Sequence, residues 1–363
     1  MRVAELALLV GLVGCARPAP TDPLPLGADA ASCGSCHEGH HDEWATSGHG
    51  TANRSPVFVA MLDEVEREWG EAARDTCVGC HDPGHGEDDA IGCLSCHAAT
   101  GNHAERDGML AVHTDRPLMG PLADPVASMA HATRSGELLA SESLCGTCHE
   151  ITGPRLVNEP TLTQFRASPA AAEGKSCIDC HAPAEAPRPL SNDSDVVRTP
   201  RSHRFVGFDP PWGADADTAA DAAERTRALL ADALTLRVTR DGDEVTVEVE
   251  NVAAGHAVPT GAAFLRDLWV DVVVDGELRA RAITIGDQPM LGDTAVPLLT
   301  RADRVEVGSL APGETRRATF TTSGPVVAEL FGRAIRPEAL AAIGRDDLEA
   351  EMPTHAIHRA EWP

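Results

Sequence analysis

The chain of 363 residues contains no tyrosine, and its seven phenylalanines and five tryptophans make up only 3% of the sequence. Aromatic side chains normally contribute much of the apolar area that a protein buries. A chain so poor in large rings would have difficulty filling a large core by itself. The composition therefore leaves room for bulky apolar groups that are not amino acids.

Basic residues are also scarce. The 30 lysines and arginines are outnumbered by 56 aspartates and glutamates, which gives a formal net charge of −26. Binding to nucleic acid requires a basic surface against the phosphates, so the composition argues against nucleic acid as a partner. An acidic surface instead favours solubility and attracts cationic partners.

The first half of the chain contains five copies of one pentapeptide, C-x-x-C-H. This spacing is the signature of covalent haem c attachment: two thiols add to the porphyrin, and the adjacent imidazole becomes the proximal iron ligand. The expected haem-bearing cysteines and proximal histidines are Cys33, Cys36 and His37; Cys77, Cys80 and His81; Cys93, Cys96 and His97; Cys145, Cys148 and His149; and Cys177, Cys180 and His181. Five covalently bound haems would supply the apolar surface that the side chains lack.

Zinc-binding or disulfide-bonded C-x-x-C pairs are the alternative interpretation of these motifs. Neither needs a histidine directly after the second cysteine in every copy, because a zinc site only requires its thiolates in pairs. Ten of the eleven cysteines lie in the motifs, so with haem attached only Cys15 remains and no disulfide framework is available. The repeat therefore favours haem.

Cys15 follows a short apolar run and the small residue Gly14. This arrangement predicts a bacterial lipoprotein signal over residues 1–15 with a lipidated cysteine, although a frayed apolar N-terminus or a misplaced start codon would look similar. Several acyl chains on one cysteine anchor a protein stably, and Ala16 rather than aspartate after it is typical of the outer membrane. We expect an exported protein anchored to the outer membrane, on its periplasmic or surface face.

Changes in composition divide the chain. Prolines indicate a tether after Cys15, the motif region is poor in strand patterns, and period-two alternation begins at Leu234. We expect a haem-cored domain of helices and irregular structure followed by an antiparallel β-sandwich-like domain. The expected segments are 1–15 (lipoprotein signal and lipobox cysteine), 16–30 (tether), 31–207 (pentahaem cytochrome c domain), 208–233 (acidic linker or helix) and 234–363 (β-sandwich domain with a C-terminal helix).

Local signals predict individual elements. A serine before a proline begins a helix over residues 55–74, and further helices are expected over 137–145 and 337–351. Asp-Gly turns predict β-hairpins. The expected strands are 234–239 with 245–249, 268–274 with 278–285, and then 304–307 and 315–321. The step of 16 residues between Cys77 and Cys93 predicts that haems two and three are close neighbours.

Residues 31–205 resemble bacterial multihaem c-type cytochromes such as the tetrahaem cytochrome that accepts electrons from hydroxylamine oxidoreductase. The resemblance rests on CGSCHEGHHDEWATSGH, where W-x-x-S-x-H follows the first motif, on GCLSCHAATGNH, similar to C-x-x-C-H-G-P-G-x-x-H, and on TLTQFRASPAAAEGKSCIDCHAP followed by SHRFVG. It implies distal iron ligands at His49, His103 and His203, and such proteins often place another where His131 lies.

Past the linker, GHAVPTG resembles a G-H-x-x-P-T-G segment of β-domains attached to multihaem cytochromes. Its glycines and proline indicate a rigid turn that would project His256 onto a haem as a fifth distal ligand; the alternative is a structural turn whose histidine caps a strand. Four methionines are expected to be packing residues: Met61, Met109, Met119 and Met129. The competing histidines are His40, His41, His85, His113, His355 and His358.

The ligand on the far side of each iron decides the function, because a second histidine gives a low-potential carrier and an open position admits a substrate. The leading interpretation is electron transfer by a membrane-anchored pentahaem cytochrome with mostly bis-histidine haems and no catalytic residue, which exchanges electrons with redox partner proteins. One alternative is a reductase or oxidase of a small nitrogen or sulfur compound at an open haem. The C-x-x-C-K motif of pentahaem nitrite reductases and the cross-linking tyrosine of hydroxylamine oxidoreductases are both missing. The other alternative is a component of a surface conduit or filament.

Overall fold

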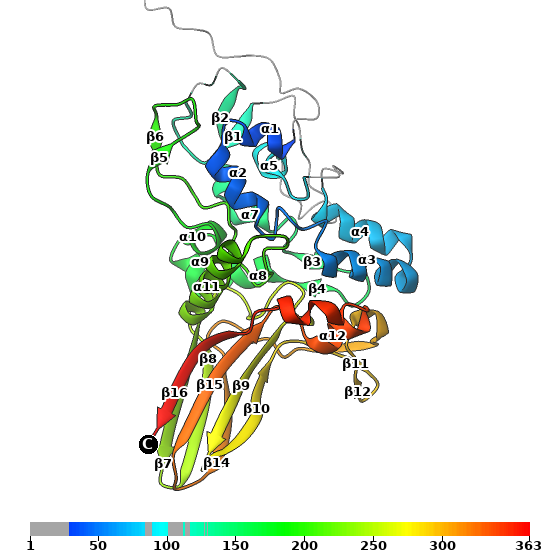
Figure 1. Ribbon diagram of the computed structural model, residues 1–363, viewed down its shortest axis with the longest axis vertical. Coiled ribbons are helices and arrows are strands. Elements are labelled where there is room, and N and C mark those ends of the chain that lie inside the picture. The colour runs from blue at the N-terminus through cyan, green and yellow to red at the C-terminus, as the bar shows by residue number, and fades with distance from the viewer. Residues whose placement is uncertain (1–28, 84–88, 101–111, 113–116, 127, 129) are drawn as a thin grey trace, which may run out of the picture.

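The computed structural model describes residues 29–83, 89–100, 112, 117–126, 128 and 130–363. An irregular, mostly helical half lies at one end of the long axis, and a half built from long antiparallel strands lies at the other (Figure 1). None of the described helices is both long enough and apolar enough to cross a membrane. The predicted features outside the described residues are the lipoprotein signal with Cys15, the tether up to residue 28, His85, His103, Met109, His113 and Met129.

Each C-x-x-C-H motif lies on a short helix or begins on one and continues into the turn after it. One helical turn places the first cysteine, the second cysteine and the histidine, at positions i, i+3 and i+4, on the same face. The motif helices are α1 (Ala30–Gly34), α4 (Glu71–His81), α5 (Cys93–His97), α7 (Glu142–Cys145) and α10 (Cys177–His181). The motifs can therefore present their thiols and imidazole together to one bound group.

Other short elements connect the motif helices. The helices are α2 (Glu38–Ala45), α3 (Pro56–Trp69), α6 (Glu137–Ala140), α8 (Thr161–Arg166) and α9 (Pro169–Ala172). The two-stranded pairs are β1 (Leu118–Gly120) with β2 (Thr133–Ser135), β3 (Ile151–Thr152) with β4 (Asn158–Glu159), and β5 (Arg188–Pro189) with β6 (Val197–Arg198). Little regular structure holds this half together.

Two predicted helices are each split in two. The first begins as expected, with the Ser55 hydroxyl accepting a hydrogen bond from the N–H of Phe58, but it ends at Trp69 because Gly70 has a φ of +90°. Glycine adopts this positive φ without the strain that a Cβ atom would cause, and α4 starts directly after it. The helix expected over 137–145 is interrupted at Ser141, which is extended and caps α7.

The strand-rich half begins where α11 (Ala216–Ala233) runs directly into the first of its long strands. One antiparallel sheet has the order β10-β9-β15-β16 and a second has the order β14-β8-β7. The strands are β7 (Leu234–Asp241), β8 (Glu244–Asn251), β9 (Asp267–Val274), β10 (Glu277–Ile285), β14 (Thr315–Thr321), β15 (Val326–Arg333) and β16 (His355–Trp362). Alternate residues of both sheets, such as Val247 and Val270, are fully buried in one shared core.

The two predicted hairpins are present as β7–β8 and β9–β10. The second turns through Asp275 and Gly276, which both have positive φ values, as a type I′ turn requires. Strand β13 (Arg304–Glu306) pairs instead with β11 (Gln288–Leu291) in a small sheet that also contains β12 (Thr294–Ala295). A short 3-10 turn, η1 (Leu299–Arg301), precedes β13.

The prediction of a C-terminal helix as the closing element is wrong. The segment 337–351 forms only α12 (Pro337–Ala342) and a 3-10 turn, η2 (Asp346–Glu351), and the chain ends on β16. Strand β15 is a further element that the sequence pattern does not predict. It lies between β9 and β16 and buries every second residue, so its strand conformation is set by its two neighbours rather than by local propensity.

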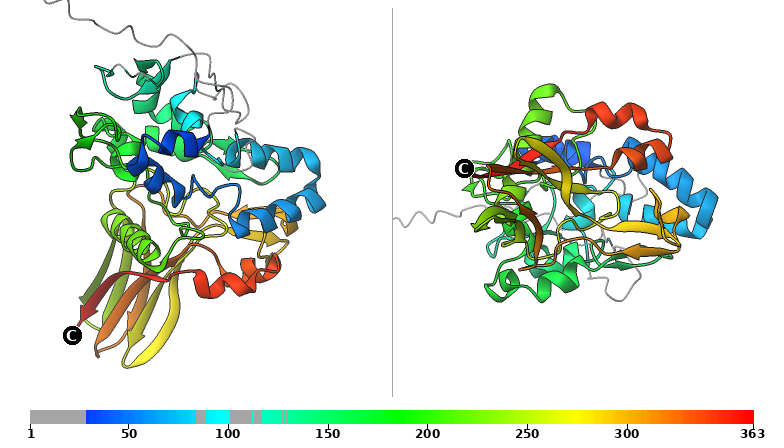
Figure 2. Two further views of the ribbon diagram at one scale, coloured as in Figure 1. Left: turned by 45° about the horizontal axis from the view of Figure 1, so that its top comes forward. Right: turned by 90° about the horizontal axis from the view of Figure 1, so that it is seen from below.

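Helix α3 belongs to a core of the strand-rich half. Val57 packs in one cluster with Leu298, Ile335 and Leu340, and α3 lies beside α12 in both views of Figure 2. The buried carboxylate of Glu64 accepts hydrogen bonds from Thr300 Oγ1 (2.9 Å) and Arg301 Nε (3.3 Å). The two halves therefore share packing and hydrogen bonds and do not form separate bodies.

Candidate functional site

A single continuous cavity of about 2250 Å³ runs through the helical half and reaches the loops of the strand-rich half. All ten cysteines and all five histidines of the motifs line it. A pocket for one small ligand is about 300–1,000 Å³. This volume therefore suits several bound groups that together form the missing core of the helical half.

The five motif histidines have one feature in common: each places its Nδ1 atom against an oxygen that can only accept a hydrogen bond. The acceptors are the carbonyl oxygen of Leu190 for His37 (2.8 Å), of Ala52 for His81 (3.3 Å), of Met119 for His97 (2.6 Å) and of Val206 for His181 (2.7 Å), and Glu159 Oε1 for His149 (2.8 Å). Nδ1 must therefore carry the proton. Nε2 is left unprotonated, which is the state that a metal-binding imidazole requires.

Three of these histidines each face a second histidine that the sequence singled out as a distal ligand. The ring centroids are 6.3 Å apart for His37 and His131, 6.3 Å for His97 and His203, and 6.1 Å for His181 and His256. Two metal–imidazole bonds of about 2.0 Å, with about 1.1 Å from each nitrogen to its ring centre, give a separation of about 6 Å. The spacing of all three pairs fits one iron between the rings.

The loop that carries His256 is held tightly against the helical half. The N–H of Ala257 donates to Gln164 Oε1 of α8 (2.9 Å), and Thr260 shares a hydrogen bond with Thr161. Gly255 lies so close to Phe165 that a Cβ atom there would come within 2.6 Å of the ring. These contacts bring a residue of the strand-rich half into the cavity beside His181.

His49 lies deep in the cavity wall, with its ring centroid 4.5 Å from that of Phe205. Burial above all, and then the neighbouring His149, His181 and His81, lower the pKa of His49 to about 3. Its imidazole is therefore neutral at physiological pH. His49 thus lines the cavity in the uncharged form that can ligate a metal.

The competing histidines near the C-terminus have structural roles. His358 Nε2 lies 2.7 Å from the Leu234 carbonyl oxygen and 3.1 Å from that of Ala231, where α11 passes into β7. His355 is buried and packs its ring against Phe208. His40 remains a candidate because its ring lines the cavity, with its centroid 4.8 Å from that of His203.

Contacts between thiols show which motifs adjoin. The cysteine pairs within hydrogen-bonding reach are Cys33 with Cys93, Cys80 with Cys148, and Cys145 with Cys177. They connect the first motif to the third, the second to the fourth and the fourth to the fifth. Helix α5 packs against α1, which lies far away in the sequence. That haems two and three are close neighbours stays a prediction, because these contacts concern the thiols and not the haems.

The chemistry of the site fits haem c better than a bare metal ion. In the described parts of the chain, no three histidine, cysteine, aspartate or glutamate side chains converge to hold a metal. Two facing imidazoles need four more ligands for an octahedral iron, and a porphyrin has four nitrogens. Arg188 also has two buried nitrogens, Nε and Nη2, without a partner among the described residues, and the carboxylates that every haem carries are suitable acceptors.

The fold is similar to that of a solved protein. A penta-heme cytochrome c552 from Thermochromatium tepidum superimposes with a TM-score of 0.67 at 17% sequence identity, over 93% of this chain and 98% of that chain. No family model matches the sequence, and no curated protein matches it. The chain thus shares its fold, a combination of helical and antiparallel β-structure, with this penta-heme cytochrome.

Proposed function

We propose that this protein is a pentahaem c-type cytochrome that transfers electrons. Bound haem c supplies an iron that changes its charge by one electron, and the polypeptide sets the spacing and potential of each iron. The motif cysteines would hold the five porphyrins, and the motif histidines would ligate each iron from one side. The motif thiols all line one continuous cavity, which supports haems close enough together to exchange electrons.

The observation that carries this proposal is the set of histidine pairs. His131, His203 and His256 would complete three irons as distal ligands, opposite His37, His97 and His181. His49, which also lines the cavity, is a further candidate for a distal ligand. Irons with two histidine ligands have no open position, which favours electron transfer over binding of a small substrate.

Redox catalysis at the second motif is the alternative that one observation favours. The ring that stacks on His81 is that of Phe58, at a centroid distance of 4.0 Å, and no ring contact joins His81 to another histidine of the described residues. The ion pair of the exposed Asp209 and the largely buried Arg266 lines the cavity nearby. An iron that is ligated only by His81 would be open to a small nitrogen or sulfur compound on this side.

Low-temperature EPR of the oxidised, haem-loaded protein tests both possibilities. Five low-spin irons per chain, measured against total haem, are the result expected for a pure electron carrier. A high-spin signal equivalent to one iron that changes when nitrite, hydroxylamine or cyanide is added would assign catalysis instead. The variant His81→Ala would then have to abolish that signal.

We also propose that the chain is exported and held at the outer membrane by acyl chains on Cys15, where it exchanges electrons with redox partner proteins. The sequence around Cys15 and the requirement for haem attachment outside the cytoplasm support this. Metabolic labelling with a radioactive fatty acid tests the anchor. The label should follow the wild-type chain into the membrane fraction and be absent from Cys15→Ala.

A further inference from the structure

Glu43 is a buried carboxylate to which the function proposed above gives no role. It lies on α2, which starts directly after the first motif, and only 3% of its side chain is exposed. A buried charge is costly unless hydrogen bonds and opposite charges compensate it. The partners of Glu43 therefore indicate what this carboxylate holds in place.

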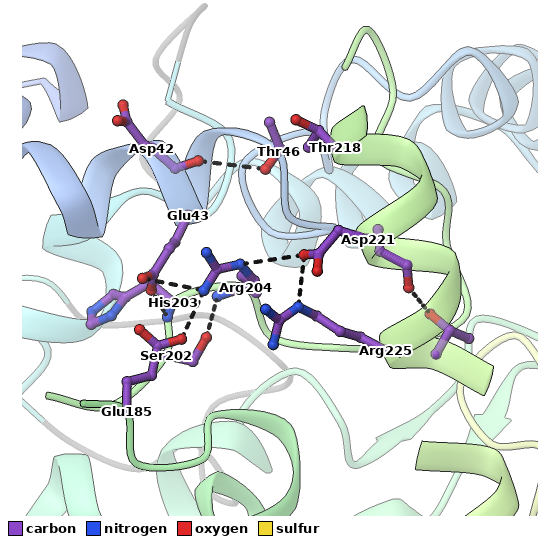
Figure 3. Close-up of polar contacts among 12 residues, drawn as sticks. Asp42, Glu43, Thr46, Glu185, Ser202, His203, Arg204, Thr218, Asp221 and Arg225 are labelled. Atoms are coloured by element: carbon purple, nitrogen blue, oxygen red, sulfur yellow. Dashed lines mark hydrogen bonds and ion pairs between the residues drawn. The ribbon is translucent and has the colours of Figure 1, made fainter. Parts of the chain in front are cut away.

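Both carboxylate oxygens of Glu43 bind the loop that carries His203. Oε2 accepts a hydrogen bond from the backbone N–H of His203 (2.8 Å), and Oε1 lies 3.2 Å from Nη1 of Arg204, the next residue (Figure 3). A hydrogen bond to a charged acceptor is stronger than a neutral one. Two successive residues of an irregular loop are thus fixed to a single side chain of a helix.

Further ion pairs surround this contact. Oε1 of Glu43 also accepts a hydrogen bond from Arg188 (3.0 Å), and Arg204 pairs with Glu185 (2.7 Å). Arg204 Nε also lies 4.0 Å from Oδ2 of Asp221 on α11. Figure 3 shows this ion pair. The network anchors Glu43 from two more segments of the chain, so its carboxylate has little freedom to move.

The ring of His203 is held at a second point, because its Nδ1 donates to the carbonyl oxygen of Arg201 (3.0 Å). This hydrogen bond orients the ring, whereas Glu43 fixes the backbone from which the ring projects. Because Nδ1 is engaged, Nε2 is the ring nitrogen of His203 that could ligate an iron held by His97.

We propose that Glu43 is a positioning residue for the iron ligand His203. Its carboxylate holds the 203–204 loop at the distance from His97 that one iron requires, and Arg188 and Arg204 compensate its charge. This inference rests on the proposed role of His203 as a distal ligand. The contact would also link two haems. Helix α2 follows the first motif, and through Glu43 it would position the distal ligand of the haem at the third motif.

The test compares four variants of the haem-loaded full-length protein by quantitative EPR and spectroelectrochemistry. Glu43→Ala removes the acceptor, and we expect one low-spin signal to convert to a high-spin one that added imidazole restores. Glu43→Gln retains an oxygen for the N–H of His203 but loses the charge. It should remain low-spin, with the potential of one haem shifted upward, and it stays informative if the alanine variant does not fold.

The matched control is Glu64→Gln, which alters an equally buried carboxylate that binds arginines but contacts no histidine in the described structure. It should leave every EPR signal and potential unchanged. His203→Ala must itself convert one haem to high-spin, and an unchanged spectrum would refute the ligand assignment and with it the role of Glu43. If His203→Ala converts a haem while both Glu43 variants keep wild-type spectra and potentials, Glu43 only stabilises the fold and the positioning role is refuted.

Discussion

At the scale of single residues, His149 differs from the other motif histidines in its hydrogen-bond acceptor. Four of them donate to backbone carbonyls, whereas His149 donates to the Glu159 carboxylate. Burial acts to lower the pKa of His149, but this contact outweighs it and raises that pKa. A carboxylate partner makes an imidazole a stronger electron donor to a metal, so the iron of the fourth motif should be the more stable in its ferric state.

Glu159→Gln should therefore raise the midpoint potential of one haem by some tens of millivolts, where about 59 mV corresponds to 1.4 kcal/mol for one electron. Spectroelectrochemical titration measures the shift. Glu150→Gln is the control, since Glu150 binds only Thr163 in the same region. Equal titration curves for the wild-type protein and Glu159→Gln would show that this carboxylate does not tune the iron.

Gly255 permits the close approach that brings His256 into the cavity. A methyl group at this position would meet the Phe165 ring at 2.6 Å and Ser168 Oγ at 3.3 Å. Overpacking of this kind costs about 1–3 kcal/mol, and we expect the loop to shift in Gly255→Ala, which reduces the low-spin signal of the haem at the fifth motif. Gly207→Ala, where a Cβ atom would make only an ordinary contact of 3.8 Å with the Phe205 carbonyl oxygen, should behave as wild type in the same EPR measurement.

At the scale of elements, β9, β10 and β15 are joined on one face by a charged cluster. Asp267 accepts hydrogen bonds from Arg281 (2.7 Å for each oxygen) and Arg333 (2.9 Å), while both guanidinium groups lie over the Trp269 ring. Burial acts to raise the pKa of Asp267, but the two arginines outweigh it and hold that pKa below its ordinary value. The carboxylate therefore stabilises the fold in its ionised form.

A depressed carboxyl pKa contributes stability that is fully present above the ordinary value of 3.8 and is lost as the pH falls through the folded-state value. Asp267→Asn should thus lower the free energy of unfolding at pH 7 by about 2 kcal/mol. The difference from wild type should shrink towards zero below pH 3.8. Denaturant unfolding followed by circular dichroism at several pH values tests this, with the exposed Asp293→Asn as a control that has little effect at any pH.

Prediction from the sequence is best where the signal lies within a few residues. The C-x-x-C-H spacing identifies ten thiols and five histidines that all line the cavity, and turn residues locate the β7–β8 and β9–β10 hairpins. Contacts between segments that are distant in the sequence cannot be predicted in this way. Strand β16 is fixed by its pairing with β15, the role of Glu43 depends on a loop 160 residues away, and no local feature of His131 indicates that it faces His37.

At the scale of the whole molecule, the two halves are coupled through α3. Leu340 of α12 is fully buried in the cluster that also holds Val57. Leu340→Ala should cost about 2–5 kcal/mol, and because α3 leads into the second motif, we expect the visible spectrum of the haems to change in the same thermal transition. The exposed Leu278→Ala is the control. A haem spectrum that stays unchanged while the strands melt would show that the halves unfold independently.

The packing of the two halves against each other also predicts the order in which the protein is assembled. All ten motif thiols line a cavity that the strand-rich half helps to enclose. For the proposed pentahaem protein we therefore expect each porphyrin to be attached before that half closes over it. Two parts of the strand-rich half pack against the helical half: the loop that carries His256 and the buried cluster that contains Leu340 of α12. Both follow all five motifs in the sequence. A chain that lacks one haem would close over empty space and lose packing, so we expect it to be cleaved by proteases faster than the fully loaded protein.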